Sequence, residues 1–290
     1  MTSNQVKISA HADAESTTME TYRQAVAANA DYVELDIRRT ADKELVAFHD
    51  PCTSQGRPLS TVGYAQLCDL AGYEVPKVTD VLAAIAGHAK GHLDLKETGD
   101  EDTLVRLALD ILGPGEFIIT SPEDASVAAI RSRFPDVEEV PLALSLGPGA
   151  WIPPRIGEQR PWPRVRDSGA NWVAVDHRLA ITGIVRRCRQ QHVGVMLWTV
   201  NHPREIRYWL SRRRIDILIT DRPALAVAIR GRKLPPNGRW SHPPAYPTKR
   251  WRIHLQSQFV QADAEREPQD RGGQQTVDRH DARIGPEALT

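Results

Sequence analysis

The sequence is poor in cysteine and contains no long apolar run. Its three cysteines, Cys52, Cys68 and Cys188, show neither a C-x-x-C pair nor the spacing of a zinc site, so we expect free thiols. No stretch approaches the roughly 18 consecutive apolar residues that a membrane span needs. Residues 1–6 are polar and lack the apolar core of a secretory signal. These absences predict a cytoplasmic protein without a transmembrane segment.

The sequence also lacks net charge. It has 37 basic and 37 acidic residues, so its overall charge gives no reason to expect nucleic acid as a partner. An anionic small molecule would have to be attracted by local charge. A chain of 290 residues with 41% hydrophobic content is long enough for one large domain with a substantial core. Its oligomeric state is left open by the sequence.

What the sequence does contain is a regular alternation of short apolar segments and helical segments. The predicted strands are 6–10, 32–38, 44–49, 92–96, 117–121, 141–145, 172–176, 194–199 and 215–220. The predicted helices are 17–29, 79–88, 102–112, 124–134, 184–190 and 203–211. Repeated strand–helix units of this size predict an α/β fold with a parallel sheet. The segments 51–60 and 147–163, rich in turn-forming residues or proline, are predicted loops.

The count of strands exceeds by one the eight of a closed TIM-type (β/α)8 barrel. Residues 39–43 are too few for a crossover helix, so we expect a hairpin-like irregularity near residue 41. Beyond residue 232 the composition changes to few aliphatic residues and much Pro, Arg, Asp, Gln and Gly. Such a segment buries too little apolar surface to offset its ordering entropy. We therefore expect a barrel over residues 1–232 and a mostly disordered tail over 233–290.

One predicted strand carries two carboxylates on the same side. Side chains alternate along a strand, so Glu34 and Asp36 share one side of residues 32–38. Two carboxylates so placed suit a hard divalent cation such as Mg²⁺ or Ca²⁺, although a solvated strand face gives the same pattern. Polar residues also end other strands, among them His11, His49 and Asp94. In a barrel of parallel strands, catalytic groups gather at that end of the strands.

The order and spacing of these motifs resemble the glycerophosphodiester phosphodiesterase family. The matching positions are His11, Tyr32–Asp36, His49-Asp50, Val75-Pro76 before a helix, Asp94-Leu95-Lys96, Trp198–Asn201 and Ile219–Pro223. The resemblance covers about residues 6 to 230. It implies a TIM-type barrel that hydrolyses phosphodiesters, such as glycerophosphocholine, to an alcohol and glycerol phosphate with a divalent cation, Mg²⁺ or Ca²⁺.

The resemblance also implies roles for single residues. Glu34, Asp36 and Asp94 are similar to three metal ligands of the family, and His11 and His49 to its general acid and base. A metal ion polarises phosphoryl oxygens and activates an attacking hydroxyl. A poor alkoxide leaving group needs a proton, and two imidazoles that titrate near neutral pH can move protons in both directions.

Two more residues are candidates for substrate contacts. Lys96 resembles the family's cation that meets the phosphate. Trp198 is a candidate wall against a glycerol or choline group, although packing at the barrel mouth is the simpler expectation. We expect His88 and His92 at the surface or the rim, without a ligand role.

The sequence departs from the family at the end of its first strand. The family reads His-Arg-Gly there, whereas Ala12 and Asp13 follow His11 in this chain. The chain thus lacks, at residue 12, a guanidinium that holds two phosphate oxygens. Asp94 is also one methylene shorter than the family's glutamate. Two alternatives follow: a barrel that binds a phosphoester without turnover, and a sphingomyelinase D-like or phosphoinositide-type phosphodiesterase.

Overall fold

The computed structural model describes residues 5–11, 17–135, 142–146, 161–212 and 214–231. The departures at Ala12 and Asp13 and the predicted tail 233–290 lie outside these residues. No helix within them is long and apolar enough to cross a membrane.

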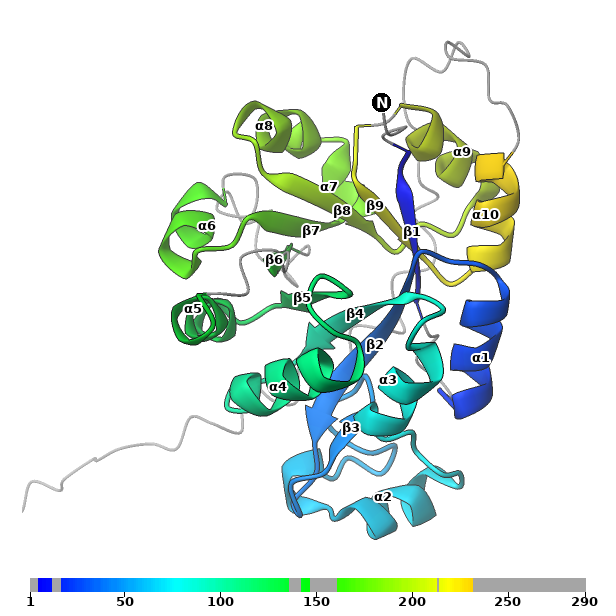
Figure 1. Ribbon diagram of the computed structural model, residues 1–290, viewed down its shortest axis with the longest axis vertical. Helices are drawn as coiled ribbons and strands as arrows, with labels where there is room; N and C mark the ends of the chain where they lie inside the picture. The colour runs from blue at the N-terminus through cyan, green and yellow to red at the C-terminus, as the bar shows by residue number, and fades with distance from the viewer. Residues whose placement is uncertain (1–4, 12–16, 136–141, 147–160, 213, 232–290) are drawn as a thin grey trace, which may run out of the picture. The chain divides into compact units, whose positions relative to one another are not determined.

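Eight parallel strands form a closed barrel, as the sequence predicts (Figure 1). The barrel strands are β1 (Lys7–Ala10), β2 (Tyr32–Arg39), β4 (Lys90–Leu95), β5 (Phe117–Ser121), β6 (Leu142–Leu146), β7 (Trp172–Asp176), β8 (Gly194–Trp198) and β9 (Ile217–Thr220). Closure comes from β1, which pairs in parallel with β2 at Ser9 and Tyr32 and with β9 at Lys7 and Ile217. The fold is therefore a TIM-type (β/α)8 barrel.

The ninth strand is the expected irregularity near residue 41. β3 (Leu45–Ala47) runs antiparallel to β2, with Ile37 opposite Ala47. The connecting turn contains Lys43 at φ 70°, which the left-handed region allows at a modest cost. The chain then forms a short 3₁₀ helix, η1 (Leu59–Thr61), and α2 (Tyr64–Ala71), where the sequence predicted a loop up to residue 60 and no helix after it. Apolar side chains of this insertion form a small core of their own: Val46, Leu59, Val62, Leu67 and Val75.

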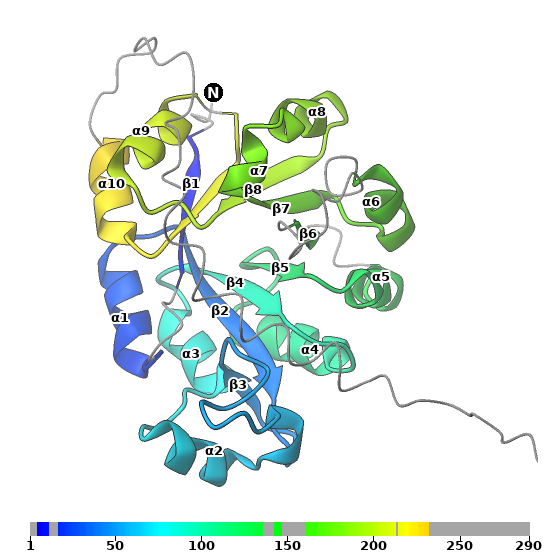
Figure 2. The same cartoon turned by 180° about the vertical axis from the view of Figure 1, so that it is seen from behind.

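Helices surround the barrel on its outer side (Figure 2). They are α1 (Met19–Ala27), α3 (Val78–Ile85), α4 (Glu101–Ile111), α5 (Asp124–Arg133), α6 (Trp162–Ser168), α7 (His177–Ala180), α8 (Ile184–Gln190), α9 (Pro203–Arg212) and α10 (Pro223–Gly231). Residues 147–160 of the predicted loop 147–163 lie outside the described residues. The end of that prediction is wrong, because Trp162 and Pro163 already belong to α6. Proline is tolerated in the first turn of a helix, where its missing N–H has no partner to lose.

The two sides of each strand enter two different cores. Outward side chains such as Leu93, Ile119 and Val173 are fully buried under the helices. Inward side chains fill the barrel itself: Ile118, Ala143, Ala174, Met196, Ile217 and Ile219. The inward positions nearer the strand ends are polar, and these carry the candidate site.

Candidate active site

Two strands place four polar side chains inside the barrel. In the parallel register of β2 and β4, Glu34 lies beside His92 and Asp36 lies beside Asp94. All four residues are buried. The side-chain alternation predicted for Glu34 and Asp36 is therefore present, and both carboxylates point into the barrel.

His11 joins the two carboxylates of β2. One nitrogen of His11 and one oxygen each of Glu34 and Asp36 lie within 4.8 Å of one another. Glu34 Oε2 is buried and accepts no hydrogen bond from the part of the chain that the structure describes. A desolvated carboxylate oxygen without a donor is costly unless a cation or a proton satisfies it. The two carboxylates of this group therefore fit a divalent cation.

Two residues that sequence reasoning used only as family motifs hold His11 in place. His11 Nδ1 lies 2.6 Å from Asp221 Oδ1, and Asn201 Nδ2 donates to the second oxygen of Asp221. Asn201 Oδ1 in turn accepts from the Asp221 N–H at 2.9 Å and from Thr220 Oγ1 at 3.0 Å. The available signal was their position, because Asn201 comes three residues after β8 and Asp221 comes directly after β9.

The acidic surroundings change the pKa of both His11 and Glu34. Burial alone lowers the pKa of His11, but Glu34, the hydrogen bond to Asp221 and the charge of Asp36 outweigh it and raise this pKa to about 10. Burial raises the pKa of Glu34 to about 8, with Asp36 and Asp94 acting in the same direction and His11 opposing them. With these neighbours His11 is an imidazolium at neutral pH.

Asp94 lies beside this group but outside it. Its Oδ1 accepts a hydrogen bond from Thr120 Oγ1 at 2.7 Å, and its Oδ2 contacts Lys96 Nζ. Lys96 Nζ also lies 2.8 Å from Asp36 Oδ1. Burial raises the pKa of Asp94, but Lys96 and Thr120 lower it further, so the net pKa lies below the ordinary range. A role for Asp94 as a third metal ligand stays a prediction.

The expectation that His92 lies at the rim is wrong. Its side chain is fully buried, because it shares the inward side of β4 with Asp94 and lies two residues deeper. His92 Nε2 lies 3.1 Å from Thr120 Oγ1, and Nδ1 lies 2.9 Å from Ser9 Oγ. Thr120 gives its single proton to Asp94, so Nε2–H donates to Thr120 and the Ser9 hydroxyl donates to Nδ1.

This tautomer explains the unsatisfied oxygen of Glu34. His92 Nδ1 is 3.6 Å from Glu34 Oε2 but carries no proton to offer. Burial lowers the pKa of His92 to about 4, so the imidazole is neutral at physiological pH. His88, in contrast, is exposed as expected.

His49 follows the hairpin and is more accessible than His11 and the buried carboxylates. The Phe48 N–H donates to the Asp36 carbonyl at 2.9 Å, which brings this segment next to the end of β2. The His49 side chain is 34% exposed, and its Nδ1 lies 2.8 Å from Asp50 Oδ1. Its Nε2 is the nitrogen left for chemistry.

Trp198 is the last residue of β8 and packs against the side chains inside the barrel. Its indole N–H donates to the Ala174 carbonyl at 3.0 Å, and its ring packs on the inward core. The side chain is half-buried at the end of β8, which fits packing at the mouth and leaves part of the ring accessible.

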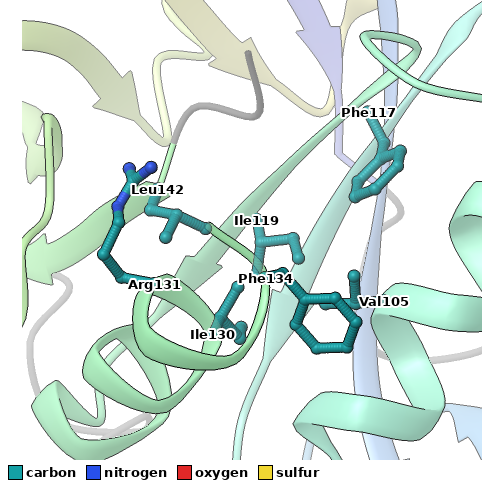
Figure 3. Close-up of a pocket in the computed structure, with 7 residues that line it drawn as sticks. All are labelled: Val105, Phe117, Ile119, Ile130, Arg131, Phe134 and Leu142. Atoms are coloured by element: carbon teal, nitrogen blue, oxygen red, sulfur yellow. The ribbon is translucent and has the colours of Figure 1, made fainter. Parts of the chain in front are cut away.

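A separate small apolar crevice, without room for a water molecule, lies outside the barrel, between the strands and the α4 and α5 helices (Figure 3). Its lining is Val105, Phe117, Ile119, Ile130, Arg131, Phe134 and Leu142. This lining contains neither a carboxylate nor a histidine, so the crevice offers no group for acid–base or metal chemistry.

Comparison with known proteins agrees with the motifs. The model of the glycerophosphoryl diester phosphodiesterase family matches residues 9–225. No curated protein sequence matches the chain.

Similar solved structures carry the same fold. A glycerophosphodiester phosphodiesterase from Thermotoga maritima is 19% identical, with a TM-score of 0.61 over 78% of this chain and 98% of that one. One from Agrobacterium tumefaciens is 19% identical, with a TM-score of 0.62 over 77% and 99% of the two chains. A phosphodiesterase from Oleispira antarctica, solved in complex with the product sn-glycerol-3-phosphate, is 15% identical, with a TM-score of 0.61 over 78% and 96%.

Proposed function

We propose that the chain, which belongs to the glycerophosphoryl diester phosphodiesterase family, hydrolyses glycerophosphodiesters with the help of a divalent cation. Membership of this family makes it a phosphoric diester hydrolase. Glycerophosphocholine is a representative substrate, and the products are an alcohol and glycerol phosphate. The observation that carries the proposal is the buried group of His11, Glu34 and Asp36 with its unsatisfied carboxylate oxygen. The product complex of the Oleispira antarctica enzyme supports the same class of substrate.

In this proposal Glu34 and Asp36 hold the cation, Mg²⁺ or Ca²⁺, with Asp94 as the third carboxylate nearby. The bound cation would polarise the phosphoryl oxygens and activate the attacking hydroxyl. His11 carries its proton and is held by Asp221, so its remaining nitrogen is placed to protonate the departing alkoxide. We assign the carboxylates to the cation and His11 to proton transfer, because Asp221 orients the His11 ring through Nδ1.

His49 is the candidate for the opposite proton transfer. Its Nδ1 is occupied by Asp50, which leaves Nε2 on a partly accessible ring to accept a proton from the nucleophile. Lys96 contributes positive charge beside the two carboxylates of Asp36 and Asp94. Trp198 offers the exposed part of its ring to the glycerol or the head group.

The test is a panel of phosphodiesters with added Mg²⁺, Ca²⁺ or EDTA. We expect hydrolysis of glycerophosphocholine that EDTA abolishes and that Glu34→Gln loses. Unchanged turnover in EDTA would contradict the cation dependence. Turnover of sphingomyelin or of a phosphoinositide alone would assign the barrel to the alternative specificity. Binding of glycerophosphocholine without any turnover would assign it a non-catalytic role.

A further inference from the structure

Arg38 lies at the mouth of the barrel, directly above the acidic group. It follows Glu34 and Asp36 on β2 with the same spacing of two residues and so extends from the same side of the strand. Its side chain is only 13% exposed. Burial lowers the pKa of Arg38, and Glu97 and Asp36 are the carboxylates that oppose this most strongly. A guanidinium keeps its proton in proteins, so Arg38 is a positive charge held next to the site by its position on β2.

Two contacts connect Arg38 to the neighbouring chain ends. Its Nε–H donates to the His49 carbonyl oxygen at 2.8 Å, which joins it to the segment after β3. Its Nη1 lies 3.6 Å from Oε2 of Glu97, which follows β4. A charge-assisted hydrogen bond is typically about 2.7 to 2.9 Å long, so this ion pair is loose. No hydrogen bond is made by Nη2 to any of the residues that the structure describes.

The carboxylates at the mouth of the barrel repel an anionic substrate, so a positive side chain that is free to meet it is needed there. A phosphodiester is an anion, and it must approach the carboxylates of Glu34, Asp36 and Asp94. The ammonium of Lys96 already contacts two of these carboxylates. Of the two cationic side chains that the described residues of β2 and of the end of β4 place beside these carboxylates, Arg38 and Lys96, Arg38 has the fewer close contacts.

We propose that Arg38 binds the phosphate of the diester through its two terminal Nη groups, an inference that rests on the proposed function. A guanidinium presents five N–H donors in a planar fork that matches two oxygens of a phosphate. One donor is used to fix the His49 backbone, and this bond orients the remaining edge of the fork. Glu97 holds the guanidinium loosely, so phosphate displaces only a weak partner.

Arg39 provides a matched control, because it is the next residue and carries the same charge on the opposite side of β2. Its Nη1 donates to Asp100 Oδ1 at 2.8 Å, and its backbone N–H donates to Glu97 Oε1 at 2.8 Å. Arg39→Gln removes one positive charge near the site without removing a group aimed at the mouth. Its backbone contact with Glu97 is retained.

The experiment compares Arg38→Gln, Arg38→Lys and Arg39→Gln with the unmodified chain. Calorimetry with sn-glycerol 3-phosphate in Mg²⁺ measures binding, and glycerophosphocholine kinetics measures KM and kcat. We expect Arg38→Gln to weaken binding and raise KM about 10- to 100-fold, the effect of losing a hydrogen bond to a charged group. Arg38→Lys keeps the positive charge but not the planar fork, so we expect it to weaken binding by about half as much as Arg38→Gln on a logarithmic scale. Arg39→Gln changes binding less than about threefold, as expected for screened charge.

Three results would overturn the proposal. The first is unchanged binding of glycerol 3-phosphate in Arg38→Gln. The second is a fall in kcat with unchanged KM and unchanged binding, which would reduce Arg38 to a support for His49. The third is absence of binding to the unmodified chain. Thermal unfolding verifies that each variant is folded, and Arg38→Lys carries the test if Arg38→Gln is not. A chain that binds glycerol 3-phosphate through Arg38 but hydrolyses no diester would refute the proposed function alone.

Discussion

The contact of His11 Nδ1 with Asp221 Oδ1, at 2.6 Å, joins two residues that lie 210 positions apart in the sequence. His11 follows β1 and Asp221 follows β9, and these are the first and last strands of the barrel. The imidazole that completes the acidic group is therefore oriented by barrel closure itself. A carboxylate that holds an imidazole in this way fixes the orientation of the ring.

This relationship predicts the effect of Asp221→Asn. The amide cannot hold the imidazolium as the carboxylate does, so we expect kcat for glycerophosphocholine to fall about 10- to 100-fold, the usual cost of losing such a partner. Asp216 precedes the same strand and accepts the Val195 N–H at 2.9 Å, far from the mouth. Asp216→Asn is therefore a control that lowers stability and leaves kcat unchanged. Equal kcat in both variants would contradict the role of Asp221.

Local patterns predict those features of the site that depend on one strand, and miss those that depend on its neighbours. The period of two placed Glu34 and Asp36 on one side because alternation is a property of a single strand. The hydrogen bond from Thr120 to Asp94 depends on the register between β4 and β5, which places these two residues side by side. The burial of His92 depends on the same register. Register is set by packing of the whole barrel, which no local pattern contains.

The same contrast holds for the fold. The five residues between the second and third predicted strands excluded a crossover helix, and β3 is indeed antiparallel. The insertion that follows, with α2, has a core formed by residues from 46 to 75, and its turn-forming sequence gave little sign of that packing. Short helices such as α7 are stabilised by tertiary contacts rather than by propensity, so they were missed.

Removal of the carboxylate pair tests the cation site. Glu34→Ala and Asp36→Ala should each abolish divalent-cation binding and leave the fold intact, because two buried carboxylates repel each other when no cation is bound. Calorimetry with Mg²⁺ and Ca²⁺ measures the affinity, and thermal unfolding measures stability. Unchanged affinity in both variants would remove these residues from the cation site.

The buried hydrogen bonds of His92 predict a stability effect that depends on the replacement. His92→Ala leaves a cavity and removes the partners of Ser9 and Thr120, so we expect a loss of about 3 kcal/mol in the free energy of unfolding. His92→Gln offers an amide that can both donate and accept, so we expect a smaller loss. Urea unfolding measures both variants. A loss of less than about 1 kcal/mol for alanine would show that these bonds contribute little.

Asp31 predicts a pH dependence of stability at the other end of the barrel. It accepts the Ile8 N–H at 2.9 Å, Lys7 Nζ at 3.2 Å and a bond from Arg230 of α10. Burial raises the pKa of Asp31, but these donors outweigh it, and the folded pKa lies below the ordinary value. An acid with a depressed folded pKa stabilises the fold above its unfolded pKa, near 4. That stabilisation is lost as the pH falls through the folded pKa.

We therefore expect Asp31→Asn to destabilise the protein by about 1 to 3 kcal/mol at pH 7, and by progressively less below pH 4. Urea unfolding of the variant and of the unmodified chain, at pH 7 and below pH 4, measures the difference in unfolding free energy. A pH-independent difference would mean that the charge of Asp31 is not what stabilises this end.

The contact between Asp31 and Arg230 also predicts how far the chain can be shortened. We propose that residues 1–232 form the barrel domain and that residues 233–290 contribute little to its stability, because their sequence has too little apolar surface. Truncation after Arg232 keeps α10 and the Arg230–Asp31 pair, so we expect a change in unfolding free energy within about 1 kcal/mol. Truncation after Arg222 removes α10 with its buried Ala226 and Ile229. We expect this truncation to lower the unfolding free energy several-fold more than truncation after Arg232 does. Similar melting temperatures for the two truncated chains would show that α10 does not stabilise the barrel, and a large loss in the first would assign stabilising contacts to residues 233–290.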